Sequence, residues 1–157
     1  MKRILLLLVA TLITGISFGQ KFQKLEFNVG ASLFSPIAKN LSWDDKAWGQ
    51  RMQLVKPKND KFAYVLNFGI QQNKDQFVQI PVLLNARHFV YRKIYVTYGT
   101  GVTFFNDEKS RFTLTTGWGV QTKRFVIEQS LFRTTASESY LGKPHDNNVG
   151  ISVLYRL

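Results

Sequence analysis

The sequence predicts an all-β fold, an eight-stranded antiparallel up-and-down β-barrel that spans a membrane, and three observations predict it. Apolar residues occupy every second position over spans of about ten residues, which is the period of a strand with one apolar face. The opposite face is small or polar, with few charges in mid-strand. The connections after the first and seventh predicted strands are long, and the others are short. Together these features are typical of a transmembrane barrel.

The clearest pattern lies in residues 76–105. Apolar side chains alternate from Val78 to Ala86 and again from Ile94 to Phe104, on either side of the turn Tyr91-Arg92-Lys93. The second face of the same segment carries polar or small residues such as Gln79. A period of two on both sides of a short turn predicts a hairpin of two long strands.

Six further strands are predicted around this hairpin: 24–34, 48–56, 61–71, 110–121, 124–133 and 148–157. Alternation is weakest in 48–56, where Trp48, Met52 and Leu54 share a face with Gln50. The connections after the second, fourth and sixth strands are short, and those after the first and seventh are long. This arrangement matches the short periplasmic turns and longer outer loops of bacterial barrels.

Residues 1–19 have the features of a cleavable signal peptide. Lys2 and Arg3 give a basic start, an apolar run follows to Ile13, and Ser17-Phe18-Gly19 offers small residues for cleavage. A transmembrane helix is the alternative, but Thr11 and later polar or small residues interrupt the run early. We therefore expect one barrel domain over residues 20–157.

The distribution of charge favours a membrane over nucleic acid as the partner. The chain has no cysteine, which excludes disulfides and thiolate metal sites, and loss of Lys2 and Arg3 lowers its formal charge from +11 to +9. Lysines are kept out of mid-strand positions, as expected when hydrocarbon surrounds the middle of the molecule. All lysines of the predicted mature chain fall in connections, turns or strand ends: Lys21, Lys24, Lys39, Lys46, Lys56, Lys58, Lys61, Lys74, Lys93, Lys109, Lys123 and Lys143.

Aromatic residues concentrate near the strand ends, which predicts two girdles at the level of the lipid headgroups. The alternative is the ordinary preference of aromatic residues for strands. One girdle would contain Phe34, Trp48, Phe77, Phe104, Phe112 and Phe132, and the other Phe22, Phe62, Tyr64, Phe89, Tyr91, Phe125 and Tyr155.

The segment Phe77–Asn85, with Ile80-Pro81 as its most specific part, resembles a strand of the PorT-like outer-membrane β-barrel family. Gly99-Thr100-Gly101, the glycines Gly117 and Gly119, and the closing segment Asn148–Leu157 are also similar to that family. The resemblance covers residues 22–157. It implies an eight-stranded barrel in the outer membrane of a Gram-negative-type cell, and it implies no catalytic residues. Leu157 departs from the aromatic residue with which such proteins usually end.

A barrel of eight strands is only wide enough to be filled by its own side chains, so we expect no conducting pore. We predict a lumen ion-pair network of Glu26, Arg87, Glu128 and Arg156, because a buried charge without a partner costs several kcal/mol. A ligand site in the lumen is the alternative. Amides on the same predicted face are Asn28, Asn67, Gln79, Asn85 and Gln121.

A catalytic site has less support. Ser137, Ser139, His145 and Asp146 lie in one long polar connection, and some small outer-membrane barrels are lipid hydrolases or acyltransferases, but no recognisable nucleophile motif surrounds these residues. His88 falls on the apolar face near a turn, where a headgroup-level position is expected. Two histidines far apart in sequence and no cysteine give a metal site little support. We expect no cofactor.

The sequence therefore predicts a non-enzymatic integral outer-membrane protein with a structural, envelope-assembly or docking role. Its expected partners are outer-membrane lipid, lipopolysaccharide and an unidentified envelope protein. One alternative is a soluble periplasmic calycin-like lipid carrier, which has the same period of two but turns its apolar face inward. The other is the lipid-modifying enzyme.

Overall fold

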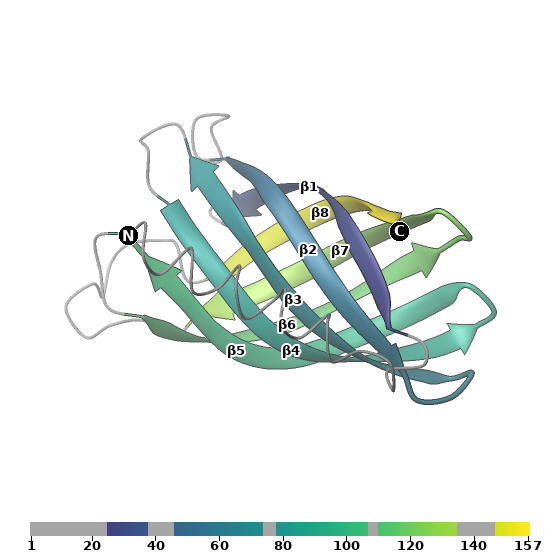
Figure 1. Cartoon of the computed structure of the whole chain (residues 1–157). Coiled ribbons are helices and arrows are strands. Elements are labelled where there is room, and N and C mark those ends of the chain that lie inside the picture. The colour runs from purple at the N-terminus through teal and green to yellow at the C-terminus, as the bar shows by residue number, and fades with distance from the viewer. Residues whose placement is uncertain (1–24, 38–45, 74–77, 107–109, 135–146) are drawn as a thin grey trace, which may run out of the picture.

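In the part of the chain that the structure describes, eight antiparallel strands form a closed barrel (Figure 1). The structure is a computed structural model that describes residues 25–37, 46–73, 78–106, 110–134 and 147–157. The predicted signal peptide and most of both long connections lie outside these ranges. The strands are β1 (Glu26–Pro36), β2 (Ala47–Pro57), β3 (Phe62–Asn73), β4 (Val78–Tyr91), β5 (Ile94–Phe105), β6 (Arg111–Gln121), β7 (Phe125–Thr134) and β8 (Asn147–Arg156).

The fold class predicted from the sequence is confirmed. Each strand pairs with its neighbour in sequence, and β1 closes the barrel against β8, from Asn28 opposite Arg156 to Pro36 opposite Asn148. The β2–β3, β4–β5 and β6–β7 turns lie together at the right in Figure 1, and we name this the turn end. The opposite end is named the loop end. No helix in the described ranges is long and apolar enough to cross a membrane.

The turns at the turn end are specified by local chemistry. Asn59 Oδ1 accepts hydrogen bonds from the backbone N–H groups of Lys61 (2.9 Å) and Phe62 (2.8 Å), which fixes the β2–β3 turn. Thr122 Oγ1 accepts from the Phe125 N–H at 2.9 Å in the β6–β7 turn. Arg92, at a φ of 37°, turns the chain between β4 and β5. Short polar side chains thus fix the β2–β3 and β6–β7 turns, and a residue at positive φ makes the β4–β5 turn.

Apolar side chains cover the outer wall, as the period of two predicts. Leu84 in the middle of β4 is 60% exposed and Ile151 of β8 is 56% exposed, although both are apolar. Between the rims, no described residue places a charge on this wall. Each described strand contributes exposed apolar residues: Leu33, Trp48, Leu66, Ile70, Ile80, Leu84, Val96, Val102, Leu114, Trp118, Ile127, Leu131, Ile151 and Val153.

Three small apolar clusters and a polar layer fill the lumen. Phe34, Ala47, Leu83 and Phe132 pack towards the loop end. Towards the turn end lie two further clusters, one of Val55, Ala63 and Val65 and one of Tyr95, Val126 and Leu154. Buried polar and charged residues occupy the rest of the interior.

The predicted aromatic girdles are wrong for Phe34, Phe132 and Phe89. Phe34 and Phe132 are buried and pack edge to face inside the barrel, with ring centroids 5.2 Å apart. Phe89 packs on Tyr95, with ring centroids 5.7 Å apart. The physical reason is strand parity: Phe34 follows the outward Leu33, so its side chain points inward.

The other described aromatic residues of the two sets stay on the wall or its rims. Phe22 and Phe77 lie outside the described residues. The exposed members are Trp48, Phe104 and Phe112 at the loop end and Tyr64, Tyr91, Phe125 and Tyr155 at the turn end.

Replacement of Gly119 by Ala is expected to lower the free energy of unfolding by about 1–3 kcal/mol. Gly119 lies opposite Tyr95, and a Cβ at Gly119 would strike the Tyr95 ring. Urea titration of the folded protein in detergent, followed by the gel shift between folded and unfolded forms, measures the change. Thr116→Ala on the outer face of the same strand is the control. Equal stability of the two variants would contradict the expectation.

Candidate functional site

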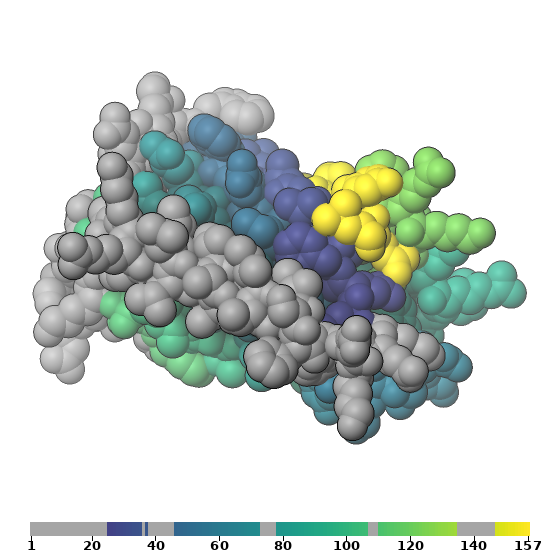
Figure 2. Space-filling view, in the orientation of Figure 1, coloured from purple at the N-terminus to yellow at the C-terminus, as the bar shows by residue number. Residues whose placement is uncertain are grey.

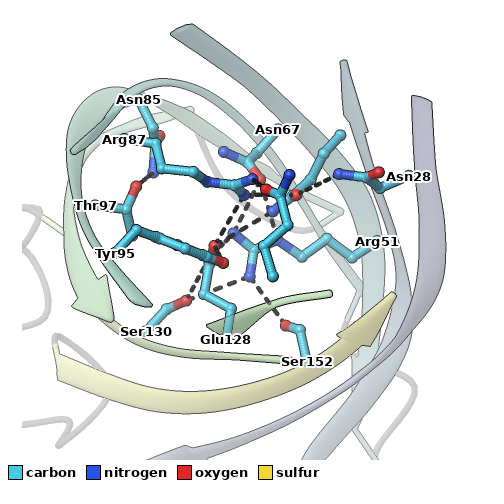
Figure 3. Close-up of polar contacts among 12 residues, drawn as sticks. Asn28, Arg51, Asn67, Asn85, Arg87, Tyr95, Thr97, Glu128, Ser130 and Ser152 are labelled. Atoms are coloured by element: carbon cyan, nitrogen blue, oxygen red, sulfur yellow. Dashed lines mark hydrogen bonds and ion pairs between the residues drawn. The ribbon is translucent and has the colours of Figure 1, made fainter. Parts of the chain in front are cut away.

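The middle of the lumen contains a buried polar network that joins strands on opposite sides of the barrel (Figure 3). Its charged members are Arg51 on β2, Arg87 on β4 and Glu128 on β7, each at most 5% exposed. Two guanidinium groups and one carboxylate give it a formal charge of +1. The residues of this lumen network are Asn28, Arg51, Gln53, Asn67, Arg87, Tyr95, Gln121, Glu128, Ser130 and Ser152.

Glu128 is the shared acceptor of the network. Its Oε1 accepts from Arg51 Nη2 at 2.6 Å and from Ser130 Oγ at 3.0 Å. Its Oε2 accepts from the Tyr95 hydroxyl at 2.8 Å and lies 3.4 Å from Arg87 Nη2. Burial of the carboxylate costs free energy because the group loses its contacts with water, and the two cationic partners offset this cost. Removal of one partner would leave part of the cost without compensation.

Arg51 spans the lumen from β2. Its Nη2 also donates to Asn67 Oδ1 at 2.9 Å, and its Nη1 donates to Ser152 Oγ at 2.9 Å. Because Asn67 lies on β3, Ser152 on β8 and Glu128 on β7, one side chain links four strands. Arg51 therefore connects opposite walls of the barrel through its hydrogen bonds.

Arg87 approaches the same carboxylate from β4. Its Nη1 donates to Gln121 Oε1 at 2.8 Å, and its Nη2 donates to Gln53 Oε1 at 3.0 Å. The guanidinium carbon lies 4.1 Å from the centroid of the Tyr95 ring, a distance suited to a cation–π contact. These contacts hold the Arg87 guanidinium against the Tyr95 ring, and both groups contact the Glu128 carboxylate.

The four residues of the predicted ion-pair network lie in two separate places. Arg87 and Glu128 meet in the lumen network. Glu26 and Arg156 pair at the turn end, with 2.7 Å between Arg156 Nη2 and Glu26 Oε2, and both side chains are partly exposed. The second pair links the first and last strands at the rim and does not contact the first in any described bond.

Three important members were missed in the sequence: Arg51, Gln53 and Tyr95. All three have the parity of lumen residues, since Trp48 and Leu54 face outward in β2 and Ile94 and Val96 face outward in β5. Strict counting from these outward neighbours would have placed them inside. Their partners could not be counted this way, because those depend on the register across several strands.

The remaining interior offers little room for a substrate. A small pocket lies near the loop end, lined by Phe34, Gln79, Thr103, Thr113 and Phe132 among others. The Thr103 and Thr113 hydroxyls bond to each other at 2.7 Å, and the two phenylalanines pack together. Among the residues that the structure describes, no three His, Asp or Glu side chains gather as metal ligands would.

The residues weighed for catalysis are not brought into a site by the described structure. Ser137, Ser139, His145 and Asp146 lie outside the described residues. His88 faces outward near the turn end and stacks on Phe62, with ring centroids 4.4 Å apart and planes inclined by 8°. The lumen network contains serine, glutamate and arginine, but it is buried and its members bind one another.

No family model matches the chain, and no curated protein matches it. Solved structures do match, and they share the fold. The designed transmembrane barrel TMB2.3 is 8% identical, with a TM-score of 0.62 over 85% of this chain and 94% of that one. The outer-membrane protein Ail of Yersinia pestis, in a phospholipid nanodisc, is 11% identical, with a TM-score of 0.60 over 85% and 100%.

Neisserial surface protein A is 12% identical, with a TM-score of 0.57 over 85% of this chain and 96% of that one. At such low identity these neighbours show the fold alone. That fold is the one of small eight-stranded outer-membrane barrels in general, and the neighbours do not single out the PorT-like family.

Proposed function

We propose that this protein is a non-enzymatic integral protein of a bacterial outer membrane, with a structural or docking role carried by the rims of the barrel. Residues 1–19 direct its export, and residues 20–157 form the barrel domain. The observation that carries the proposal is the outer wall, where apolar side chains are exposed on every described strand and charge is confined to rims and lumen. Hydrocarbon, and not water, suits such a wall.

The packing of the lumen supports a closed barrel without a conducting channel. Phe34 and Phe132 pack across the interior towards the loop end, and the lumen network fills the middle. Eight strands leave space only for side chains. We therefore expect no stepwise ion conductance when the purified protein is added to a planar lipid bilayer. Reproducible single-channel steps at physiological salt would contradict this prediction, and an established porin serves as the positive control.

The orientation of the faces argues against a soluble lipid carrier. A calycin-like carrier would turn the apolar face inward around a ligand, whereas Val102 and Ile151 are exposed and Arg51, Arg87 and Glu128 are buried. The interior is polar at its centre and packed. A lipid tail would find neither an apolar lining nor space there.

The partner of the rims is part of the proposal. Anionic groups of the envelope, on phospholipid or lipopolysaccharide, complement the formal charge of +9 that remains without the signal peptide. One structural neighbour, Ail of Yersinia pestis, was solved with the heparin analogue sucrose octasulfate. Binding of anionic envelope components through rim residues is the corresponding role for this chain, and an envelope protein partner fits the same rims.

Membrane extraction tests the proposal. After alkaline carbonate treatment the protein should stay in the membrane fraction, and unboiled samples should migrate differently from boiled ones in a detergent gel, because a closed barrel resists the detergent. A soluble periplasmic protein with its own signal peptide is the control. Recovery in the soluble fraction would contradict the proposal.

The enzymatic alternative is tested by His145→Ala, which should leave the envelope lipid composition unchanged.

A further inference from the structure

The charges outside the lumen are distributed unequally between the two ends of the barrel. At the turn end, the side chains of the described residues include seven exposed cations and one exposed acid, Asp60. The remaining charges there, Glu26 and Arg156, neutralise each other. We name the cations the turn-end collar: Lys56, Lys58, Lys61, Arg92, Lys93, Lys123 and Arg124.

The formal charges of the loop end and of the connections that follow its strands cancel. Lys46, Arg111 and Arg133 are its described cations, and the sequences of the connections 38–45, 74–77, 107–109 and 135–146 add four lysines and seven acidic residues. Cations and acids are therefore equal in number when the described loop-end residues and the sequences of these connections are counted together. The excess positive charge of the barrel, apart from the lumen and the residues before β1, belongs to the turn-end collar.

The turn-end collar lies on three sides of the barrel, and the neutral Glu26–Arg156 pair lies at the seam of β1 and β8. Its members lie in or beside the β2–β3, β4–β5 and β6–β7 turns, which alternate around the perimeter, and long side chains of the last two turns project beyond the barrel at the right in Figure 2. Exposed aromatic and apolar residues lie next to the collar on the outer wall, on the side towards the middle of the barrel, and they include Tyr91, Ile94, Phe125 and Tyr155. Arg92 already lies over the Tyr91 ring, 5.7 Å from its centroid. Cations above an aromatic belt lie at the height of lipid phosphates.

From this placement we propose that the turn-end collar binds the phosphates of anionic phospholipids in the periplasmic leaflet. This inference rests on the proposed membrane function and names the partner of one rim. Short turns face the periplasm in bacterial barrels, which selects the phospholipid leaflet over lipopolysaccharide. A lipid annulus contacts all three of the barrel sides on which collar cations lie, whereas a single polymer would favour cations on one side. Each cation near a charged membrane surface strengthens association about fivefold.

Two native tryptophans report on the two ends. Trp118 faces outward near the turn end, between the β4–β5 and β6–β7 turns, and Trp48 faces outward at the loop end. The chain has a third tryptophan, Trp43, which lies outside the described residues and is replaced in both reporter variants. W43F/W48F keeps Trp118, and W43F/W118F keeps Trp48. Each is folded into phosphatidylcholine vesicles that contain either brominated phosphatidylglycerol or brominated phosphatidylcholine, and quenching is compared. Brominated lipid in both leaflets makes the result independent of orientation.

Trp118 should show a preference of about fivefold for brominated phosphatidylglycerol at low salt, falling towards one at high salt, and Trp48 should show little preference. In the W43F/W48F background, R92Q/K93Q/K123Q/R124Q should abolish the preference, and K46Q/R111Q/R133Q should leave it intact. The boiled and unboiled gel shift verifies that each variant folds. Quenching by brominated phosphatidylcholine tests membrane insertion itself, so failure of insertion is distinguished from failure of the collar.

Four results would overturn the proposal: no preference at Trp118, an equal preference at both tryptophans, a preference at Trp48 alone, or persistence of the preference in the R92Q/K93Q/K123Q/R124Q variant. Retention of fluorescent single-stranded DNA by the barrel in neutral micelles, together with no lipid preference, would assign the collar to nucleic acid instead.

Discussion

Replacement of Glu128 by Gln is expected to lower the free energy of unfolding by about 3–5 kcal/mol, because it leaves two buried guanidinium groups without a counter-charge. Glutamine keeps the size of the side chain and can still accept hydrogen bonds, so the loss reports on charge and not on packing. Arg51 and Arg87 bind Glu128 at 2.6 Å and 3.4 Å, and all three side chains are buried. Urea titration of the barrel in lipid vesicles measures the change.

Glu26→Gln is the matched control. It removes the carboxylate of the other ion pair, but Glu26 and Arg156 are partly exposed at the rim, so the expected loss is about 1 kcal/mol or less. The double variant R51Q/E128Q should lose less than the sum of the two single variants, because it removes one buried cation together with the carboxylate. A Glu128→Gln barrel as stable as the Glu26→Gln barrel would show that the lumen network does not hold the wall together.

Replacement of Leu84 by Arg is expected to destabilise the barrel in a bilayer by about 2–4 kcal/mol. Leu84 lies at the middle of β4 and is 60% exposed, so in water an arginine there would cost little. In hydrocarbon the same charge is far from any headgroup. The measurement is the free energy of unfolding in vesicles of defined thickness, or the folded fraction on gels after insertion.

Val90→Arg provides the control on the same strand, at a position that is exposed to the same extent. Val90 is 61% exposed but lies next to the turn end, where the cost for a charge falls to about 0–1 kcal/mol. Because both side chains are about equally exposed, the difference in cost between the two positions reports on their depth in the membrane. If both variants fold and unfold like the parent protein, the wall around Leu84 is not surrounded by lipid.

Most of the fold could be read from the sequence, because a barrel wall imposes one rule on every strand. The predicted strands agree with the observed bounds to within two residues, including 48–56, whose alternation was weakest. That strand looked irregular because Gln50 lies among apolar residues on the outward face. Its inward face is regular in burial, because Gly49, Arg51, Gln53 and Val55 are all buried.

The connectivity of the lumen network could not be read in the same way. Alternation shows that Arg87 and Glu128 face inward, but β4 and β7 are not neighbours in the barrel, and their contact depends on strand tilt and on the length of each side chain. Glu26 and Arg156 pair with each other at the rim because β1 and β8 are adjacent. Charge complementarity alone did not distinguish these arrangements.

The aromatic residues show a related limit. Proximity to a strand end suggested a girdle for Phe34 and Phe132, although the parity of Phe34 points inward. Both rings fill the lumen near the loop end. The position of a ring along a strand gives its height in the barrel, and only its parity gives its side.

The pairing of β1 with β8 also has a consequence for biogenesis. Ser32 and Ser152, which share a hydrogen bond of 2.8 Å across this seam, are 120 positions apart in the sequence. Every other strand pairing joins consecutive strands. The β1–β8 pairing therefore closes the longest loop, loses the most conformational entropy and is expected to form last. Until then the nascent sheet has two open edges that invite association with other chains. A holding chaperone should therefore raise the yield of inserted protein by delaying aggregation of the unsealed form.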